Sequence, residues 1–280
     1  MSRSLGAFGV WARGAAASPE LAAELEALGY GALWIGSSPR ADLAQSEQLL
    51  DATDELVVAT GIVNIWASPA AEVARSYHRI AARYPARFLL GIGVGHPEAT
   101  GDRYRRPYEA LVEYLDALDG AGVPKDDLAL AALGPKVLRL AAERTAGAHP
   151  YLTTPEHTRS ARELLGAGPL IAPEQHVVLD VDPARARALA RSALATYLGM
   201  VNYRNNWLRL GFTDADLEDG GSDALVDALV AHGDEAAVVA RLREHLDLGA
   251  DHVCLQLLVE PGADPLPGYR RLAAALTSAA

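Results

Sequence analysis

The chain has 280 residues, of which 50% are hydrophobic and 22% are charged, and its formal net charge is -11. This length is ample for a complete hydrophobic core, and so acidic a chain lacks the basic field that general affinity for nucleic acid or anionic membranes requires. There is no signal-peptide pattern and no run near the ~20 unbroken apolar residues of a membrane span. We therefore expect a single domain over residues 1–280, cytoplasmic, acting on small molecules and binding neither nucleic acid nor membranes.

Apolar runs and helical stretches alternate along the chain. The first helical stretch, residues 18–29, has Ser18 as N-cap, Pro19 in the first helical position and Gly29 after its last turn. The apolar runs, each expected to be a strand, are residues 5–11, 31–36, 56–66, 88–95, 128–133, 147–152, 176–181 and 252–258. This repetition predicts an α/β fold, a (β/α)8 TIM barrel, because an open doubly wound sheet would usually have fewer strands and a topological switch point.

The alternation breaks between the seventh and eighth runs. Residues 183–250 contain several helical stretches in place of one. We interpret them as a helical insertion in the barrel and not as a second domain. Packing and dimer contact are the plainest role of such an insertion, and a lid over the C-terminal mouth of the barrel is the alternative.

The third run, LVVATGIVNIW, is a strand with a glycine in its middle. Its Val and Ile residues suit a strand that is buried on both faces, and Gly61 indicates a bulge or a close approach of another backbone. The end of this strand is therefore a candidate floor for a ligand. The alternative is a core strand that ends in an ordinary turn.

The residues just beyond the strands are poor in acids and bases. In a (β/α)8 barrel these positions face the active site. His96 is the one histidine among them, and Asp180 and Asp182 serve equally well as caps for the helix that follows. Such a set favours a cofactor that carries the chemistry itself.

Glycines mark two further strand ends. The motif GIGVG at residues 91–95 lacks the third glycine of a dinucleotide fingerprint, and it predicts instead a surface without side chains against which a planar ring or a phosphate can lie. Gly134, Pro135 and Lys136 open a helix after the fifth run. A lysine in the first turn opposes the helix dipole unless an anion lies there, so this helix start is a candidate phosphate site, with a solvated surface lysine as the alternative.

No metal site is expected. The histidines have no ligand-like spacing with carboxylates, and no HExxH motif occurs. Cys254 is the single cysteine of the chain, which excludes a disulfide framework and a thiolate cluster and predicts a buried, inert thiol.

Together these segments resemble a known family. The pattern runs through ATGIVNIW, then GIGVGHP, then RRPYEALVEYLDALDG, then LGPKVLRLAAERTAGAHPYLTTPEHT, between residues 59 and 158. It is similar to the bacterial luciferase-like superfamily, and more closely to its coenzyme F420-dependent oxidoreductase branch. The resemblance implies a (β/α)8 barrel with an insertion near the seventh strand and a homodimer.

The resemblance also implies a binding site for the cofactor. A bulge with a non-proline cis peptide, which backs the deazaflavin ring in this branch, maps onto Gly61, Ile62, Val63 and Asn64, and we expect the Gly61–Ile62 peptide to be cis. The glycine-rich fourth strand end maps onto Gly93, Gly95 and His96. The phosphate loop maps onto Gly134, Pro135 and Lys136.

The chain departs from the family pattern where a catalytic group would stand. Sugar-phosphate dehydrogenases of this branch have an Asp-His pair after the second strand and a Glu after the fourth, whereas this chain has Gly36, Ser37 and Val94 there. Oxidation of glucose 6-phosphate by that mechanism is therefore not expected. No catalytic residue is assigned, and Ser37 and His96 remain candidates; the residues expected to line the substrate site are Trp11, Ser37, Trp66 and Tyr151.

The expected activity is hydride transfer between F420 and a small organic substrate bound over the ring at the barrel mouth. One alternative is an FMN-dependent luciferase-like monooxygenase, because FMN can activate oxygen and a deazaflavin cannot. The other is a non-catalytic F420-binding barrel, which the scarcity of acid-base residues would suit.

Overall fold

The computed structural model describes residues 4–278. Its strands form one parallel sheet, in the order β10-β9-β11-β1-β2-β3-β5-β6-β7-β8, with β4 paired to β5. The strands are β1 (Phe8–Ala12), β2 (Ala32–Ile35), β3 (Val57–Thr60), β4 (Val63–Asn64), β5 (Phe88–Gly93), β6 (Leu128–Leu130), β7 (Gly147–Ala148), β8 (Leu170–Ile171), β9 (Glu174–Val178), β10 (Val230–His232) and β11 (Val253–Leu257).

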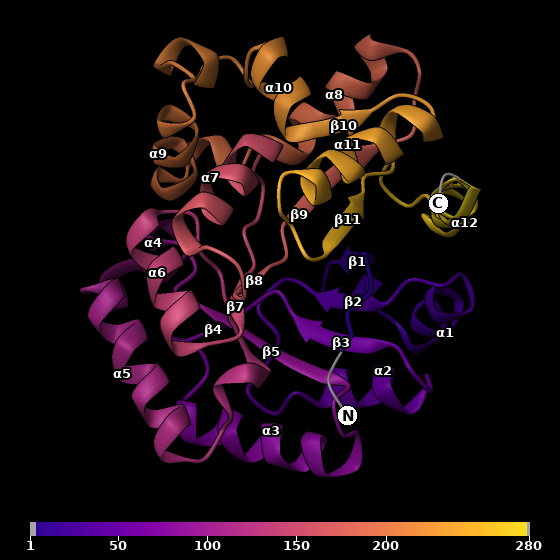
Figure 1. Ribbon diagram of the computed structural model, residues 1–280. Coiled ribbons are helices and arrows are strands. Elements are labelled where there is room, and N and C mark those ends of the chain that lie inside the picture. The colour runs from indigo at the N-terminus through magenta and orange to yellow at the C-terminus, as the bar shows by residue number, and fades with distance from the viewer. Residues whose placement is uncertain (1–3, 279–280) are drawn as a thin grey trace.

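The chain between β8 and β9 joins the two flanks of this sheet. β8 pairs with β7, whereas β9, two residues further on, pairs with β11. Within this stretch the Glu174 N–H donates to the Pro150 carbonyl (2.8 Å), and the Pro173 carbonyl accepts from the Cys254 N–H (3.0 Å). The parallel sheet is therefore curved, and it curls around a common interior in the manner of a barrel (Figure 1).

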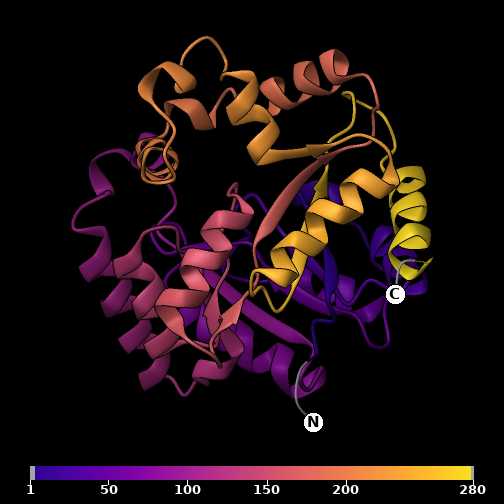
Figure 2. The same cartoon turned by 45° about the horizontal axis from the view of Figure 1, so that its top comes forward.

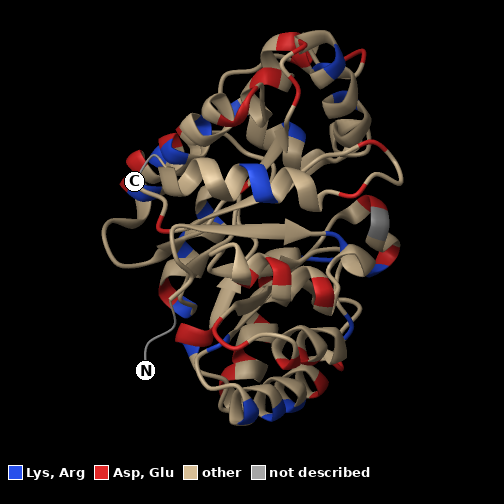
Figure 3. Cartoon of the chain, turned by 90° about the vertical axis from the view of Figure 1, so that its right-hand side faces the viewer, with Lys and Arg blue, Asp and Glu red and all other residues tan. Residues whose placement is uncertain are grey.

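Most of the helices cover the outside of the sheet, whereas α9 lies beyond the strand ends (Figures 1 and 2). They are α1 (Pro19–Ala27), α2 (Ala44–Asp51), α3 (Ala70–Arg83), α4 (Pro97–Thr100), α5 (Pro107–Gly120), α6 (Pro135–Arg144), α7 (Pro155–Leu165), α8 (Pro183–Leu194), α9 (Val201–Arg209), α10 (Asp223–Leu229), α11 (Glu235–Asp247) and α12 (Leu266–Ser278). Charged residues gather on these helices and their loops, and the strands are almost free of them (Figure 3). Within the described part of the chain, no helix combines the length and the apolar character needed to cross a membrane.

Several local predictions are confirmed. Ser18 caps α1, its Oγ accepting from the Leu21 N–H at 3.2 Å, and Gly29 after the helix has a φ of +85°. Asp182 caps α8 through the N–H groups of residues 184 and 185. Cys254 is fully buried. Hydrogen bonds of these caps satisfy helix-end N–H groups that would otherwise lack partners.

Two predictions about strands were wrong. The seventh strand does not begin at residue 176 but as β8 at Leu170, and Pro173 splits it, because proline has no N–H to offer the ladder. The segment 183–250 was expected to contain several helical stretches and no strand, yet Val230–His232 forms β10 and extends the sheet beside β9. The run ALVDALVAH has helical spacing, and pairing with β9 overrides it at its end.

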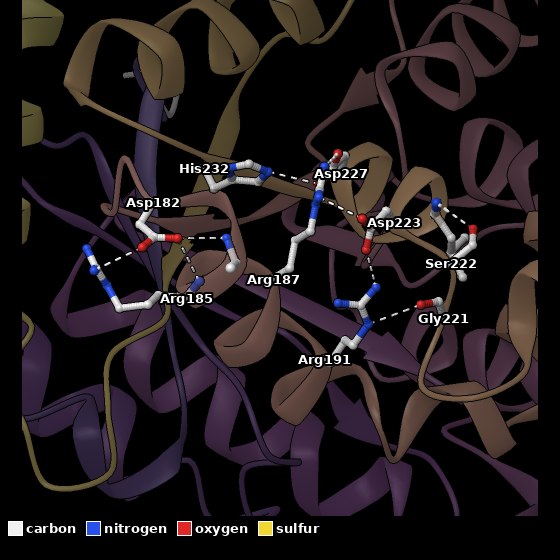
Figure 4. Close-up of polar contacts among 11 residues, drawn as sticks. Asp182, Arg185, Arg187, Arg191, Gly221, Ser222, Asp223, Asp227 and His232 are labelled. Carbon is white, nitrogen blue, oxygen red and sulfur yellow. Dashed lines mark hydrogen bonds and ion pairs between the residues drawn. The ribbon is translucent and has the colours of Figure 1, made fainter.

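Ion pairs connect α8, α10 and β10. Arg187 of α8 bonds Asp223 (2.7 Å) and Asp227 (2.6 Å) of α10, and Asp227 also accepts from His232 of β10 (2.9 Å) (Figure 4). Arg191 adds a second bond to Asp223. Apolar side chains of α8, α9 and α10 form their own cluster beneath these pairs, which stabilises the segment as one packed layer.

Candidate functional site

A cavity of about 620 Å³ lies beside the carboxyl ends of the strands, the edge where parallel barrels place their active sites. Its wall includes residues that follow β1 to β7 and residues 196–209 around α9. The predicted site residues that lie in this wall are Trp11, Ser37, Gly61, Ile62, Asn64, Gly95, His96, Gly134, Lys136 and Tyr151. Most of the residues predicted from sequence are thus brought together around one cavity.

The other predicted site residues lie outside the wall. Val63 is fully buried in the core, because it alternates with Ile62 and Asn64 and its side chain faces the opposite side of the strand. Gly93 is buried behind Ile62, and Pro135 starts α6. Trp66 is half-buried, and its indole N–H donates to the Val94 carbonyl (2.9 Å). Val94 belongs to the wall, whereas Trp66 does not.

One end of the cavity is formed by the break between β3 and β4. The Gly61–Ile62 peptide is cis, as expected. The glycines of β5 let this backbone lie close: a Cβ on Gly91 would stand 1.9 Å from the Thr60 carbonyl oxygen, and one on Gly93 would stand 3.1 Å from Ile62 Cδ1. Gly91 and Gly93 therefore do not form the predicted surface for a ring or a phosphate, because Thr60 and Ile62 lie over them and, of the glycines in this motif, the described wall contains Gly95 alone. Their role is to let the break pack closely against β5.

Two polar side chains lie beside Gly61 without partners. Trp11 Nε1 and His149 Nε2 are both buried, and neither has a hydrogen-bond partner among the described residues. His149 Nδ1 lies 2.8 Å from the Ala172 carbonyl, and the ring stacks on Trp34 with centroids 4.1 Å apart. Burial lowers the pKa of His149 to about 4, so this imidazole is neutral at pH 7.

Sequence reasoning missed His149. It stands in the sixth apolar run, GAHPYL, and was treated as part of that strand, whereas β7 ends at Ala148 and the histidine follows it into the cavity wall. A histidine directly after a short barrel strand was the available signal.

Positive charge also lines the cavity. The wall contains Arg13, Lys136 and Arg209, and no Asp or Glu is among the wall residues that the structure describes. Lys136 Nζ lies 3.6 Å from the ring centre of Tyr108, and Arg209 Nη2 lies 3.8 Å from the position a Cβ on Gly134 would take. In a chain with a net charge of -11, this local excess of cations favours an anionic ligand at the start of α6.

The residues around α9 close one side of the cavity. Asn202 bonds His96 across the wall (Oδ1 to Nδ1, 3.1 Å), and Tyr197 bonds Tyr151 (hydroxyl oxygens 3.1 Å apart). Arg13 donates to the Tyr197 hydroxyl at 3.3 Å. Residues 196–209, within the segment that was predicted to be an insertion, therefore contribute directly to the wall. The aromatic residues of this segment, at helical spacing, were the sequence signal for that contact.

Tyr151 is held between this segment and the barrel. Its hydroxyl donates to Gln256 Oε1 at 2.9 Å, and its ring lies 5.0 Å from that of Trp11. Burial, together with the neighbouring Tyr197, raises the pKa of Tyr151 well above its ordinary value, so the hydroxyl keeps its proton. Ser37 and His96, the catalytic candidates, both reach the cavity, but no hydrogen bond between them occurs within residues 4–278.

Comparisons with known proteins identify the family of the chain. The model of the family "luciferase-like monooxygenase" matches residues 8–252 of the chain. No curated protein matches the sequence.

Solved structures with the same fold are distant in sequence. An F420-dependent secondary alcohol dehydrogenase in complex with an F420-acetone adduct has 15% identity and a TM-score of 0.74, over 99% of both chains. The coenzyme F420-dependent tetrahydromethanopterin reductase of Methanopyrus kandleri has 16% identity and a TM-score of 0.69, over 99% of both chains. The oxygenating constituent of 3,6-diketocamphane monooxygenase of Pseudomonas putida, in complex with FMN, has 15% identity and a TM-score of 0.68, over 95% of both chains. The fold is thus that of the luciferase-like TIM barrels.

Proposed function

Because the chain belongs to the luciferase-like monooxygenase family, whose members are flavin- or deazaflavin-dependent oxidoreductases, we propose that it is an F420-dependent oxidoreductase acting on a small organic substrate. The observation that carries the proposal is the polarity of the cavity. The break at Gly61 and Ile62 supplies a neutral surface in the wall, and Lys136 and Arg209 supply positive charge in the same wall. A flat neutral ring with an anionic tail has the matching polarity.

The residues present fit such a cofactor. Ile62 and Gly61 would support the ring. The start of α6, with Lys136 and Arg209, would hold the phosphate. Arg13 adds a third cation to the wall, which suits F420, with its phosphodiester and carboxylate tail, better than a ligand with a single phosphate.

When bound, the deazaflavin supplies a hydride, and the protein positions the ring and the substrate and excludes water from the site. Trp11, Tyr151 and Tyr197 give the cavity an aromatic side on which an organic substrate can pack. The Tyr151 hydroxyl keeps its proton and can donate a hydrogen bond to a substrate oxygen once it turns from Gln256.

A titration tests the proposal. Purified protein is titrated with F420 and, separately, with FMN, and cofactor fluorescence and heat of binding are recorded. Saturable binding of F420 at micromolar or lower concentration, tighter than that of FMN, is the expected result. The absence of saturable F420 binding would refute the proposal.

The runner-up is an FMN-dependent monooxygenase. It is favoured by the similarity to the FMN-bound 3,6-diketocamphane monooxygenase, whose fold covers 95% of this chain. A yellow protein after purification, or oxygen uptake with NADH and FMN, would select it. Tight F420 binding without turnover of enones, imines or alcohols would instead select a non-catalytic F420-binding barrel.

A further inference from the structure

His96 lies in the cavity wall with one ring nitrogen free. It follows Gly95, and a Cβ on Gly95 would lie 2.5 Å from Asn64 Nδ2, so the histidine lies next to the end of β4. His96 Nδ1 lies 3.1 Å from Asn202 Oδ1. Its Nε2 has no hydrogen-bond partner in the described part of the chain and, unlike Nε2 of His149, is not buried. The free nitrogen is therefore open to a ligand of the cavity.

The start of α9 is fixed against the loop that follows β5. The N–H of Val201, the first residue of the helix, donates to Glu98 Oε1 at 3.1 Å. The ring of Tyr203 lies 5.3 Å from that of His96. Together with the bond to Asn202, these contacts limit the rotation of the imidazole, so its two nitrogens keep distinct surroundings.

The bond to Asn202 decides which nitrogen of His96 carries the proton. The amide oxygen Oδ1 can only accept, so in the neutral ring the proton lies on Nδ1. Nε2 is then left with a lone pair and can only accept. A ligand group that meets Nε2 must be a donor, which excludes a phosphate, a carboxylate or a ketone oxygen at this place.

The charge of the wall selects among donors. A protonated amine would enter a wall that contains Arg13, Lys136 and Arg209 and, among the described residues, no Asp or Glu. Repulsion from these cations disfavours an ammonium group. A neutral hydroxyl group carries no such penalty, and the ring of Tyr203 gives an apolar surface for the carbon skeleton that carries it.

We propose that Asn202 is a positioning residue that holds His96 in the Nδ1–H tautomer, and that His96 Nε2 accepts a hydrogen bond from a hydroxyl group of the substrate. The inference rests on the proposed function, to which it adds a substrate class, namely an apolar molecule with a neutral hydroxyl group. It also gives the segment 183–250 a role in substrate recognition, because Asn202 belongs to α9.

Nuclear magnetic resonance of the purified protein tests the tautomer without any cofactor. Long-range 1H–15N correlations of the neutral His96 ring should show a protonated Nδ1 and a bare Nε2. Asn202→Leu should lose this preference, and Asn202→Asp, which keeps an acceptor oxygen, should retain it. Asn205→Leu is the matched control, because Asn205 is an exposed wall residue of the same helix without a bond to His96. It should leave the tautomer unchanged.

Ligand titrations test the hydroxyl contact. Cyclohexanol and 1-phenylethanol are titrated into protein saturated with F420, each against its methyl ether, which keeps the carbon skeleton and lacks the donor. The wild-type protein should bind each alcohol about fivefold more tightly than its ether, the effect of one neutral hydrogen bond, and the alcohol should shift the 15N resonance of His96 Nε2. His96→Leu should bind alcohol and ether alike. Cyclohexylamine, which is protonated, should bind more weakly than cyclohexanol.

The outcomes separate this inference from the proposed function. A proton on His96 Nε2 in the wild-type protein, or an unchanged tautomer in Asn202→Leu, would overturn the role of Asn202. No preference for either alcohol over its ether would overturn the hydroxyl contact, while binding of F420 to the same protein would leave the proposed function standing. Failure of F420 to bind would refute the proposed function and the substrate assignment with it. Circular dichroism and thermal unfolding confirm that each variant compared is folded.

Discussion

Replacement of Lys136 or Arg209 by methionine should weaken binding of the phosphorylated cofactor and leave binding of the corresponding nucleoside unchanged. Both cations lie in the cavity wall at the start of α6, and neither has a carboxylate partner among the described residues. Hydrogen bonds to charged groups contribute about 1.5–3 kcal/mol, but both side chains are exposed, and solvent screening reduces this to about 1 kcal/mol each. The dissociation constant should therefore rise about fivefold for each variant and roughly 25-fold for the double variant.

Fluorescence titration at low and high salt measures this effect. Because exposed charges are screened over about 10 Å at 0.1 M salt, the wild-type protein should lose affinity for the phosphorylated cofactor as salt rises, and the double variant should lose less. Arg139→Met is the matched control, since Arg139 is an exposed cation of the same helix that lies outside the cavity wall. Equal losses for the phosphorylated cofactor and the nucleoside, or an equal effect of Arg139→Met, would refute the assignment of this end of the cavity to an anion.

Two further predictions concern stability. Gly91→Ala places a Cβ 1.9 Å from the backbone oxygen of Thr60 and should lower the free energy of unfolding in urea by about 2–4 kcal/mol. Gly120→Ala, at an open helical position, is the control and should be neutral or slightly stabilising. Similar values for the two variants would contradict the role of Gly91 as a backbone contact. Burial holds the pKa of His149 and of His252 at about 4, below the unfolded value of about 6.5, so the unfolded state takes up protons first and the free energy of unfolding should fall as pH drops from 6.5 to 4. Urea titrations at pH 7.5, 6 and 5 check this, and a free energy of unfolding independent of pH would exclude neutral buried histidines.

Most of the fold could be predicted from the sequence because barrel strands are buried on both faces. Continuous apolar runs mark such strands without help from the partner strand, and the expected runs all contain a strand. β8 and β10 escaped detection because their pairing with β7 and β9 is decided by neighbours that are distant in sequence. Short strands of this kind carry too few residues to show a period of their own.

The part of the candidate site that could be predicted from sequence follows directly after the strands, because residues at these positions of a parallel barrel face the site. Gly61, Gly95 and Gly134 are visible because a missing side chain is a property of the residue itself. The partnerless state of His149 is different, because it depends on Ala172 occupying its other nitrogen. Arg209 likewise reaches the cavity only because α9 packs over it.

FMN and F420 differ most in their tails, since the two rings carry the same pyrimidinedione. Discrimination between the two cofactors must therefore come from the cations of the wall, where the number and spread of Arg13, Lys136 and Arg209 can register how many anionic groups the tail carries. It follows that variants of these cations should change the preference between FMN and F420, while variants of Gly61 and Ile62, which would support the ring, should change the affinity for both cofactors in parallel.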